Sequence, residues 1–160
     1  MPTVAVVEGW AVGGGLAIAA ACDFRIATPE TRFGVPIART LGNCLSTANL
    51  ARLVSALGAQ RVRRMLMLAE LLDTSELEAC GFLSTVCPAE ALDAAVAALC
   101  ARLAALAPLT QRVSKEGLRR LVAQNIPDDA DLIRSCYGSA DFREGVDAFV
   151  ARRAPVWTGR

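Results

Sequence analysis

The stretch that decides the fold runs from Val4 to Asp23 and reads VAVVEGWAVGGGLAIAAACD. Its first four residues form an apolar, valine-rich run that ends before Glu8, which is typical of a short strand buried on both faces. The glycines Gly13 to Gly15 predict a tight turn, and the small apolar residues of 16–22 favour a helix. The stretch therefore predicts a strand, a glycine turn and a buried helix.

The triple glycine is not a dinucleotide-binding fingerprint. The G-x-G-x-x-G spacing is absent, and Phe33 and Gly34 stand where an acidic ribose ligand would be. A nucleotide-dependent oxidoreductase is therefore disfavoured. Glycines at a helix start can instead present backbone N–H groups to a developing negative charge. A plain tight turn or a close packing contact is the alternative.

The rest of the chain predicts an α/β start followed by helices. Residues 1–87 are expected to form the α/β core and residues 88–160 a helical region, with the long loop 33–44 as a wall of a binding site. The stripe Leu92–Leu106 is either ordinary core or a subunit interface. The other expected strands are 24–26 and 82–86. Helices are expected over 47–57, 59–72, 88–106, 108–124, 128–137 and 146–153. The capping pattern Ser75-x-x-Glu78 predicts one further short helix, and Asp141-x-x-Glu144 precedes the helix 146–153.

Composition excludes several classes of protein. The 160 residues are 54% hydrophobic and 21% charged, which is enough apolar sequence for one domain or part of one. A net charge of +1 gives no general reason to bind nucleic acid or an anionic membrane. The chain has no histidine, so Ser/His/Asp triads, Cys/His pairs and HExxH zinc sites are excluded.

The cysteines and the apolar segments indicate a cytoplasmic protein without a metal site. None of the six cysteines is spaced as C-x-x-C, so they are expected to be small apolar residues of a reduced protein. The uncharged segment Gly9–Cys22 is too short to span a membrane and lacks a basic region before it. We expect it to be a buried core segment.

Two separated motifs resemble those of one known family. The first comprises Val6–Gly15, 21–27 (ACDFRIA) and 33–36 (FGVP), and the second is the stretch Asp141–Trp157. Together they resemble the crotonase superfamily, also called enoyl-CoA hydratase/isomerase. The resemblance covers essentially the whole chain but only the later, C-terminal part of the family pattern.

The resemblance implies a crotonase-like spiral of ββα units, incomplete at its N-terminus, with a helical C-terminal oligomerisation region. It implies a homotrimer or homohexamer that acts on acyl-CoA thioesters, with coenzyme A as part of the substrate and no separate cofactor. The absent part normally supplies the first oxyanion-hole N–H and much of the acyl and CoA pocket.

The family's site residues carry over to few positions. Gly14 matches the second oxyanion-hole donor, whose N–H stabilises a thioester enolate. Hydratases carry an acid three residues after that glycine and another after the proline of the Phe-Gly-x-Pro motif, and here these positions are Ala17 and Ile37. Because hydration needs groups that activate water and deliver a proton, ordinary hydratase chemistry is not expected through them.

Other polar residues lie near the same motifs. Three acids, Glu8, Asp23 and Glu30, are expected to be capping or solvated groups. Closer to Ile37 lie the candidates for a replacement site, Arg39, Thr40, Asn43 and Cys44.

Phe149 and Arg152 match the aromatic and basic positions that help hold the adenine and phosphates of CoA. Their spacing of three places them on one helix face, and a core Phe149 with a solvated Arg152 is the alternative. The sequence thus predicts a crotonase-like acyl-CoA-binding protein that stabilises an enolate. The alternative function is a noncatalytic CoA-binding or assembly module, or a shortened product that needs a full-length partner.

Overall fold

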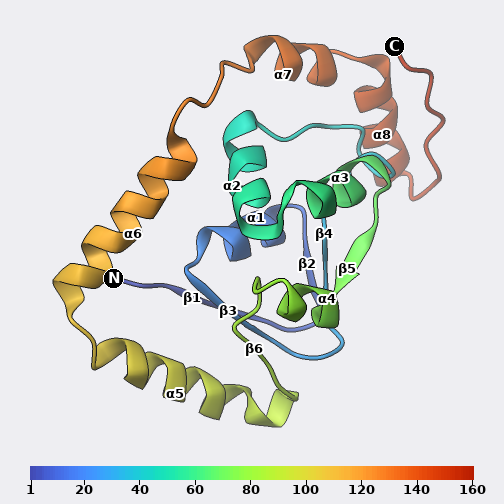
Figure 1. The fold of residues 1–160 in the computed structure, drawn as a ribbon. Coiled ribbons are helices and arrows are strands. Elements are labelled where there is room, and N and C mark those ends of the chain that lie inside the picture. Colours follow the sequence, from blue (N-terminus) through green and yellow to red (C-terminus); the bar gives the residue numbers. More distant parts are fainter.

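The computed structural model describes residues 1–160 and contains six short strands, eight α-helices and one 3₁₀ turn (Figure 1). The strands are β1 (Val4–Val7), β2 (Trp10–Val12), β3 (Phe24–Ala27), β4 (Arg32–Gly34), β5 (Leu71–Asp73) and β6 (Thr85–Val86). The helices are α1 (Gly14–Ala21), α2 (Thr47–Leu57), α3 (Ala59–Met67), α4 (Thr74–Ala79), α5 (Leu92–Ala104), α6 (Pro108–Ala123), α7 (Ala130–Tyr137) and α8 (Ala140–Val150), and the 3₁₀ turn is Ala89–Ala91.

The strands form two small sheets of three strands each. In the first sheet β3 lies between β1 and β6, and all three strands are parallel. In the second sheet β4 pairs in parallel with β2 and antiparallel with β5. The successive pairs β1 and β2, β3 and β4, and β5 and β6 each contribute one strand to each sheet. This is the spiral α/β arrangement that the family resemblance implies.

The core lies between the two sheets and helices α1 to α4. Leu16 of α1, Phe33 of β4 and Phe82 are almost completely buried, and the two aromatic rings meet edge to face with centroids 5.9 Å apart. The small residues of α1 allow the helix to pack closely on the sheets. The expectation of a first strand buried on both faces is wrong, because the Val6 side chain is 46% exposed.

Tertiary contacts displaced several local expectations. The helix expected over 59–72 ends at Met67, because Leu72 lies in β5 and pairs there with Phe33 of β4. The cap of α4 is Asp73, whose Oδ1 accepts from the Glu76 N–H at 2.9 Å, and not Ser75. The strands β2 and β4 are not among the expected elements, and β4 includes the first two residues of the loop expected over 33–44. Similarly, Ser139 rather than Asp141 caps α8.

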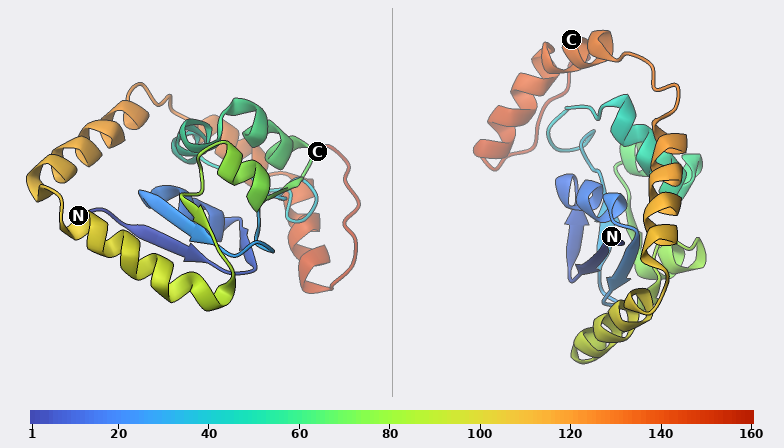
Figure 2. Two further views of the ribbon diagram at one scale, coloured as in Figure 1. Left: turned by 60° about the horizontal axis from the view of Figure 1, so that its bottom comes forward. Right: turned by 90° about the vertical axis from the view of Figure 1, so that its left-hand side faces the viewer.

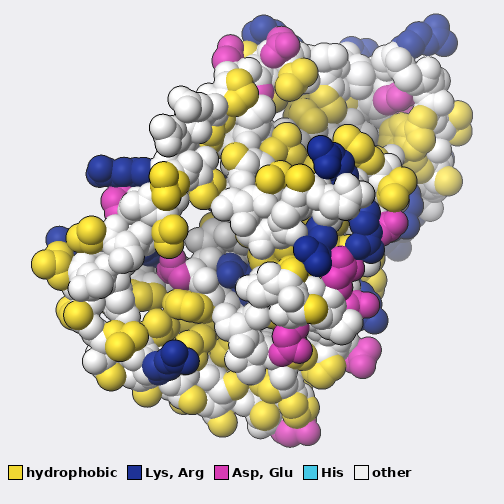
Figure 3. All heavy atoms as spheres, in the orientation of Figure 1, with side chains coloured by type: hydrophobic (Ala, Val, Ile, Leu, Met, Phe, Trp, Pro, Cys, Tyr) yellow, Lys and Arg dark blue, Asp and Glu magenta, His cyan; other side chains and the backbone are white.

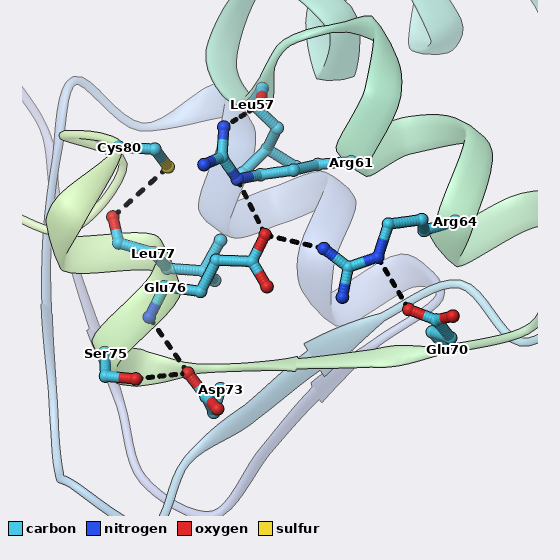
Figure 4. A network of polar contacts seen from close by, with 9 residues as sticks. All are labelled: Leu57, Arg61, Arg64, Glu70, Asp73, Ser75, Glu76, Leu77 and Cys80. Atoms are coloured by element: carbon cyan, nitrogen blue, oxygen red, sulfur yellow. Dashed lines mark hydrogen bonds and ion pairs between the residues drawn. The ribbon is translucent and has the colours of Figure 1, made fainter.

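Four arginine and glutamate side chains join α3 to β5 and α4 (Figure 4). Glu76 Oε1 accepts from Arg61 Nε at 3.0 Å and from Arg64 Nη1 at 2.8 Å. Arg64 Nε also donates to Glu70 at 2.7 Å, directly before β5. The network therefore ties α3 to the start of β5 and to α4.

Every element after β6 is helical. Figures 1 and 2 show α5 to α8 running around the outside of the strands and of α1 to α4. Along the expected stripe, Leu92 is buried but Leu106 is 52% exposed. No single helix is long and apolar enough to cross a membrane; only Ala89–Ala104 and Pro108–Ala123 taken together pass on length and composition, and they are bent by 102°.

Large apolar side chains remain exposed on the helical region. Hydrophobic side chains gather over α5 and α6 at the lower left of Figure 3. On α6 the exposed members are Leu109, Val113, Leu118 and Leu121, and on α8 they are Val146, Phe149 and Val150. Contiguous apolar surface of this kind is typical of a protein interface.

Candidate functional site

The start of α1 is fixed by a single backbone contact to β4. Gly13 has φ 54° and ψ −117°, a conformation that a side chain would strain. Its N–H donates to the Gly34 carbonyl at 2.9 Å, and its own carbonyl accepts from the Ala17 N–H at 3.1 Å. The bond brings the first turn of α1 to the beginning of the loop that follows β4.

The first turn of α1 presents backbone donors that have no partner. The N–H groups of Gly14, Gly15 and Leu16 make no hydrogen bond to any backbone or side-chain acceptor, and no side chain caps the helix. Gly14 and Gly15 are exposed, and a Cβ at either would meet nothing within 4 Å. Unpaired donors and the positive end of the helix dipole together favour an anionic oxygen at this point.

Ala17 and Ile37, the two positions where hydratases carry acids, both lie close in sequence to the residues that form this turn. Ala17 follows in the first turn of α1, and Ile37 lies three residues beyond Gly34. Ile37 is partly buried against the core, and its carbonyl accepts from the Gly42 N–H at 2.8 Å. Neither side chain can take up or deliver a proton.

The other acids weighed for the site lie elsewhere. Glu8 and Glu30 precede β2 and β4, at the strand ends opposite to Gly13 and Gly34. Asp23 follows the far end of α1 and forms an ion pair with Lys115 at 2.6 Å. Burial alone would raise the pKa of Asp23, but hydrogen bonds from Lys115 and the chain near the N-terminus lower it below its ordinary value. Asp23 is therefore a structural anchor for α6.

The polar residues of the 39–44 segment make no hydrogen bond to the first turn of α1. Thr40 Oγ1 donates to the Pro36 carbonyl at 3.0 Å, and the Arg39 side chain is exposed and makes no hydrogen bond. The Asn43 Oδ1 atom is buried without a hydrogen-bond partner. Cys44 lies beside Cys136 of α7. No hydrogen bond joins this segment to Gly14, so the structure assembles no replacement acid–base pair there.

Phe149 and Arg152 are both exposed, but they do not share a helix. Helix α8 ends at Val150, and Arg152 adopts a left-handed φ of 53° in the turn beyond it. The expectation of one helical face is therefore wrong, because the chain turns back so that Arg153 can pair with Glu144. Phe149 is 66% exposed, which rules out its core alternative. No hydrogen bond links either residue to α1.

An apolar cavity of about 740 Å³ lies at the other end of α1. It separates α6 from the core, and its lining includes Ala20, Phe24, Leu103, Leu118 and Leu121. The cavity thus lies away from the unpaired N–H groups. No three His, Cys, Asp or Glu side chains are placed to hold a metal ion, and all six cysteines are free.

Sequence reasoning found Gly14 but missed the parts that position it. The Gly34 carbonyl fixes Gly13, and a Cβ at Gly34 would lie 2.6 Å from Leu71 Cδ2 and 3.0 Å from the Glu70 carbonyl oxygen. Gly34, the glycine of the FGVP segment, was the available signal, because a glycine in a strand often marks a close backbone approach.

Comparison with known proteins identifies relatives over the whole chain. A family model described as enoyl-CoA hydratase/isomerase matches residues 1–160. A probable enoyl-CoA hydratase of Mycobacterium bovis is 30% identical over 163 residues, covering 99% of this chain and 63% of the relative. Crotonyl-CoA hydratase of Syntrophomonas wolfei is 30% identical over 156 residues, covering 95% of this chain and 60% of the relative.

The fold is similar to that of solved CoA-dependent enzymes. Methylmalonyl-CoA decarboxylase in complex with 2-nitronate-propionyl-CoA superposes with a TM-score of 0.91 at 25% identity, covering 99% of this chain and 63% of that one. This likeness confirms the crotonase-like α/β fold. The chain spans less than two thirds of the length of the relatives it matches.

Proposed function

We propose that this chain, which belongs to the enoyl-CoA hydratase/isomerase family, binds acyl-CoA thioesters and stabilises the thioester enolate through the backbone N–H of Gly14. The observation that carries the proposal is the first turn of α1, where three consecutive N–H groups lack acceptors. The enolate oxygen of a thioester is the small anion that suits such donors.

The geometry favours the enolate over the ground-state thioester. A carbonyl oxygen carries little charge, whereas the oxygen of an enolate carries a nearly full negative charge. Preorganised N–H groups and the dipole of α1 interact more strongly with the charged form, and this difference is what lowers a barrier. Because no acidic residue occupies the first turn, nothing in α1 opposes the negative charge.

Hydration is not part of the proposal. It requires one group that activates water and another that delivers a proton to carbon. Ala17 and Ile37 provide neither. Glu8 and Glu30 precede β2 and β4, and Asp23 follows α1, so all three lie at the ends of these elements that are far from Gly14. An enolate at Gly14 must therefore arise without a carboxylate base at those two positions.

Decarboxylation of a 2-carboxyacyl-CoA is the second candidate function. The bond between the α-carbon and the carboxylate breaks, CO₂ leaves, and the electron pair remains as the enolate that Gly14 stabilises. Water then protonates the α-carbon. The absence of acids at Ala17 and Ile37 favours this route, because it needs no proton acceptor. The fold likeness to methylmalonyl-CoA decarboxylase is consistent with it.

A noncatalytic CoA-binding or assembly module remains the alternative. It is supported by the same two substitutions and by the exposed apolar side chains of α6 and α8. In this alternative those faces pack against further copies, as a homotrimer or a homohexamer. Exposed Phe149 and Arg152 then meet a CoA adenine and phosphate, by ring stacking and by guanidinium contacts.

Amide NMR with a CoA thioester tests the binding proposal. We expect acetyl-CoA to shift the ¹⁵N–¹H signals of Gly14, Gly15 and Leu16 more than those of α3, which serves as an internal reference. Calorimetry on the same sample measures the affinity. No heat at millimolar acetyl-CoA, or shifts confined to other helices, would overturn the proposed site.

Two substrates then separate the candidate reactions. We expect CO₂ release from methylmalonyl-CoA but no hydration of crotonyl-CoA by the unmodified chain. The double variant with Ala17→Glu and Ile37→Glu is expected to gain hydration. Hydration by the unmodified chain would contradict the acid-free mechanism, whereas thioester binding with neither reaction would support the noncatalytic module.

A further inference from the structure

The loop after β4 is fastened to the helical region on both sides of Cys44. Before it, the Cys136 thiol of α7 donates to the Gly42 carbonyl at 3.3 Å. After it, Asp129 Oδ2, at the start of α7, accepts from the Thr47 N–H at 2.6 Å. These contacts bracket Cys44 and hold it against α7.

The two thiols in this bracket lie on neighbouring segments. The Cys136 thiol contacts the carbonyl of Gly42, two residues before Cys44, and Asp129, at the start of the same helix, holds Thr47, three residues after Cys44. Both side chains are partly exposed, and both cysteines are unpaired as disulfides. Cys136 also lines an open hollow of about 610 Å³ with Gly42 and Ser139 as neighbours, through which a small reagent can reach it.

We propose that Cys44 and Cys136 form a dithiol site that a low-molecular-weight disulfide, such as oxidised glutathione, converts into an intramolecular disulfide. The Cys44 thiolate attacks the reagent, which releases one glutathione thiolate and leaves a mixed disulfide on Cys44. The Cys136 thiolate then attacks the Cys44 sulfur and releases the second glutathione. Two protein thiols are oxidised to one disulfide, and the external disulfide is reduced to two glutathione thiols, which take up the two protons that the protein thiols lose.

The surroundings assign the order of attack. Burial, together with the adjacent Cys44 thiol, raises the pKa of Cys136 to about 11. Cys136 is therefore protonated at neutral pH and is a poor first nucleophile, so it is assigned the second attack. The contacts of Gly42 and Thr47 with α7 then hold the mixed disulfide on Cys44 near Cys136.

The disulfide would hold the loop that carries Ile37 to α7. The loop begins directly after Gly34, which fixes the start of α1, so oxidation would restrict a wall of the candidate site. This consequence does not depend on which thioester the site takes. It also holds for a chain that binds no CoA.

Oxidation of the full chain followed by peptide mapping tests the proposal. We expect excess oxidised glutathione to give a monomeric product whose mass is lower by two hydrogens, with Cys44 and Cys136 joined in one peptide pair. Dithiothreitol should reverse the change. The thermal midpoint should rise by roughly 10 °C, because the bond closes a loop of about 90 residues.

Matched variants distinguish this pair from the remaining cysteines. Cys44→Ser and Cys136→Ser should each abolish the intramolecular bond, and Cys44→Ser should also lose the mixed disulfide at that site. Cys100→Ser is the control, because Cys100 is exposed on α5 and should leave the oxidation unchanged. Circular dichroism checks that each variant is folded. If Cys44→Ser does not fold, Cys44→Ala is used in its place.

Three outcomes would overturn the proposal. The first is a folded chain that forms no intramolecular bond at any glutathione ratio. The second is a bond that survives in Cys44→Ser or Cys136→Ser, and the third is pairing that involves Cys22, Cys80, Cys87 or Cys100. None of these outcomes bears on acetyl-CoA binding, so failure here and failure of the proposed function are separately visible.

Discussion

The N–H of Gly13 donates to the carbonyl of Gly34 at 2.9 Å, and this bond joins the first turn of α1 to the end of β4. The second sheet therefore positions the unpaired donors of the candidate site. Because β5 lies on the other side of β4, the Arg64–Glu70 ion pair in front of β5 supports the same arrangement.

Gly34→Ala should destabilise the chain. The added Cβ would lie 2.6 Å from the flexible Leu71 tip but also 3.0 Å from the Glu70 carbonyl oxygen, so the β4–β5 backbone must shift. We expect the free energy of unfolding in urea to fall by about 1–3 kcal/mol. Gly15→Ala is the matched control, because its Cβ meets nothing within 4 Å and alanine favours a helix. Equal effects of the two variants would contradict this account.

Gly14→Pro should remove the proposed donor while keeping the fold. Proline is tolerated at the first position of a helix, where its missing N–H had no partner. We expect whichever reaction the chain catalyses to slow by roughly 10²–10³ in kcat. The control is Gly14→Ala, which keeps the N–H and enters open space. An unchanged kcat in a folded proline variant would exclude Gly14 as a donor.

Arg25→Ala should be among the more harmful changes to stability. The Arg25 guanidinium lies 4.4 Å from the centroid of the Phe82 ring. It also donates to four carbonyls, those of Ala19, Cys22, Asp23 and Phe82. We expect urea unfolding to show a loss of about 2–4 kcal/mol, because four partly buried carbonyls lose their donor. Arg52→Ala should cost far less, since exposed Arg52 contacts only Asn49.

Glu144 should titrate far below an ordinary glutamate. Hydrogen bonds from Arg153, and then from the Val156 N–H, lower its pKa from 4.5 to about 2. A lowered pKa stabilises the folded chain above pH 4.5, and this contribution is lost as the pH falls from 4.5 towards 2. Carboxyl ¹³C NMR should show the low pKa, and Arg153→Ala should move it back up. A Glu144 pKa near 4.5 in the unmodified chain would contradict the pairing.

Gly145→Ala should loosen α8 from the loop after β4. A Cβ at Gly145 would collide with the Leu41 carbonyl, and Gly145 is buried there. We expect faster amide hydrogen exchange in α8 than in α3, and a loss of about 1–3 kcal/mol. Gly117→Ala in α6 is the control, since its Cβ meets nothing within 4 Å. Unchanged exchange in α8 would show that this contact does not hold the helix.

Local patterns predicted most of the core elements. The valine run, the triple glycine and the small residues after it correctly placed β1 and α1, and Gly58 correctly separated α2 from α3. These signals are local, because glycine conformation and apolar period act within a few residues. The family resemblance added the spiral arrangement, which no short-range pattern contains.

The errors arose where distant segments meet. Leu71 and Leu72 fit a helical period, but pairing with β4 drew them into β5, and a turn with Ala69 at φ 52° ends α3 first. Arg152 fits the period of α8, but the Arg153–Glu144 pair turns the chain at that point. In the site, Gly14 was identified from the resemblance, while its support by Gly34 depends on a strand pairing that sequence spacing does not encode.

Strand β1 has a neighbour on one side only, because the order of its sheet is β1, β3, β6. Its outer edge is a row of main-chain groups in the uncharged sequence VAVV, with Val6 turned outward. An open edge without a charge or a proline is a template on which another chain can add a strand. At high concentration the isolated chain should therefore self-associate through cross-molecular strand pairing, and a lysine at Val6 should keep it dispersed.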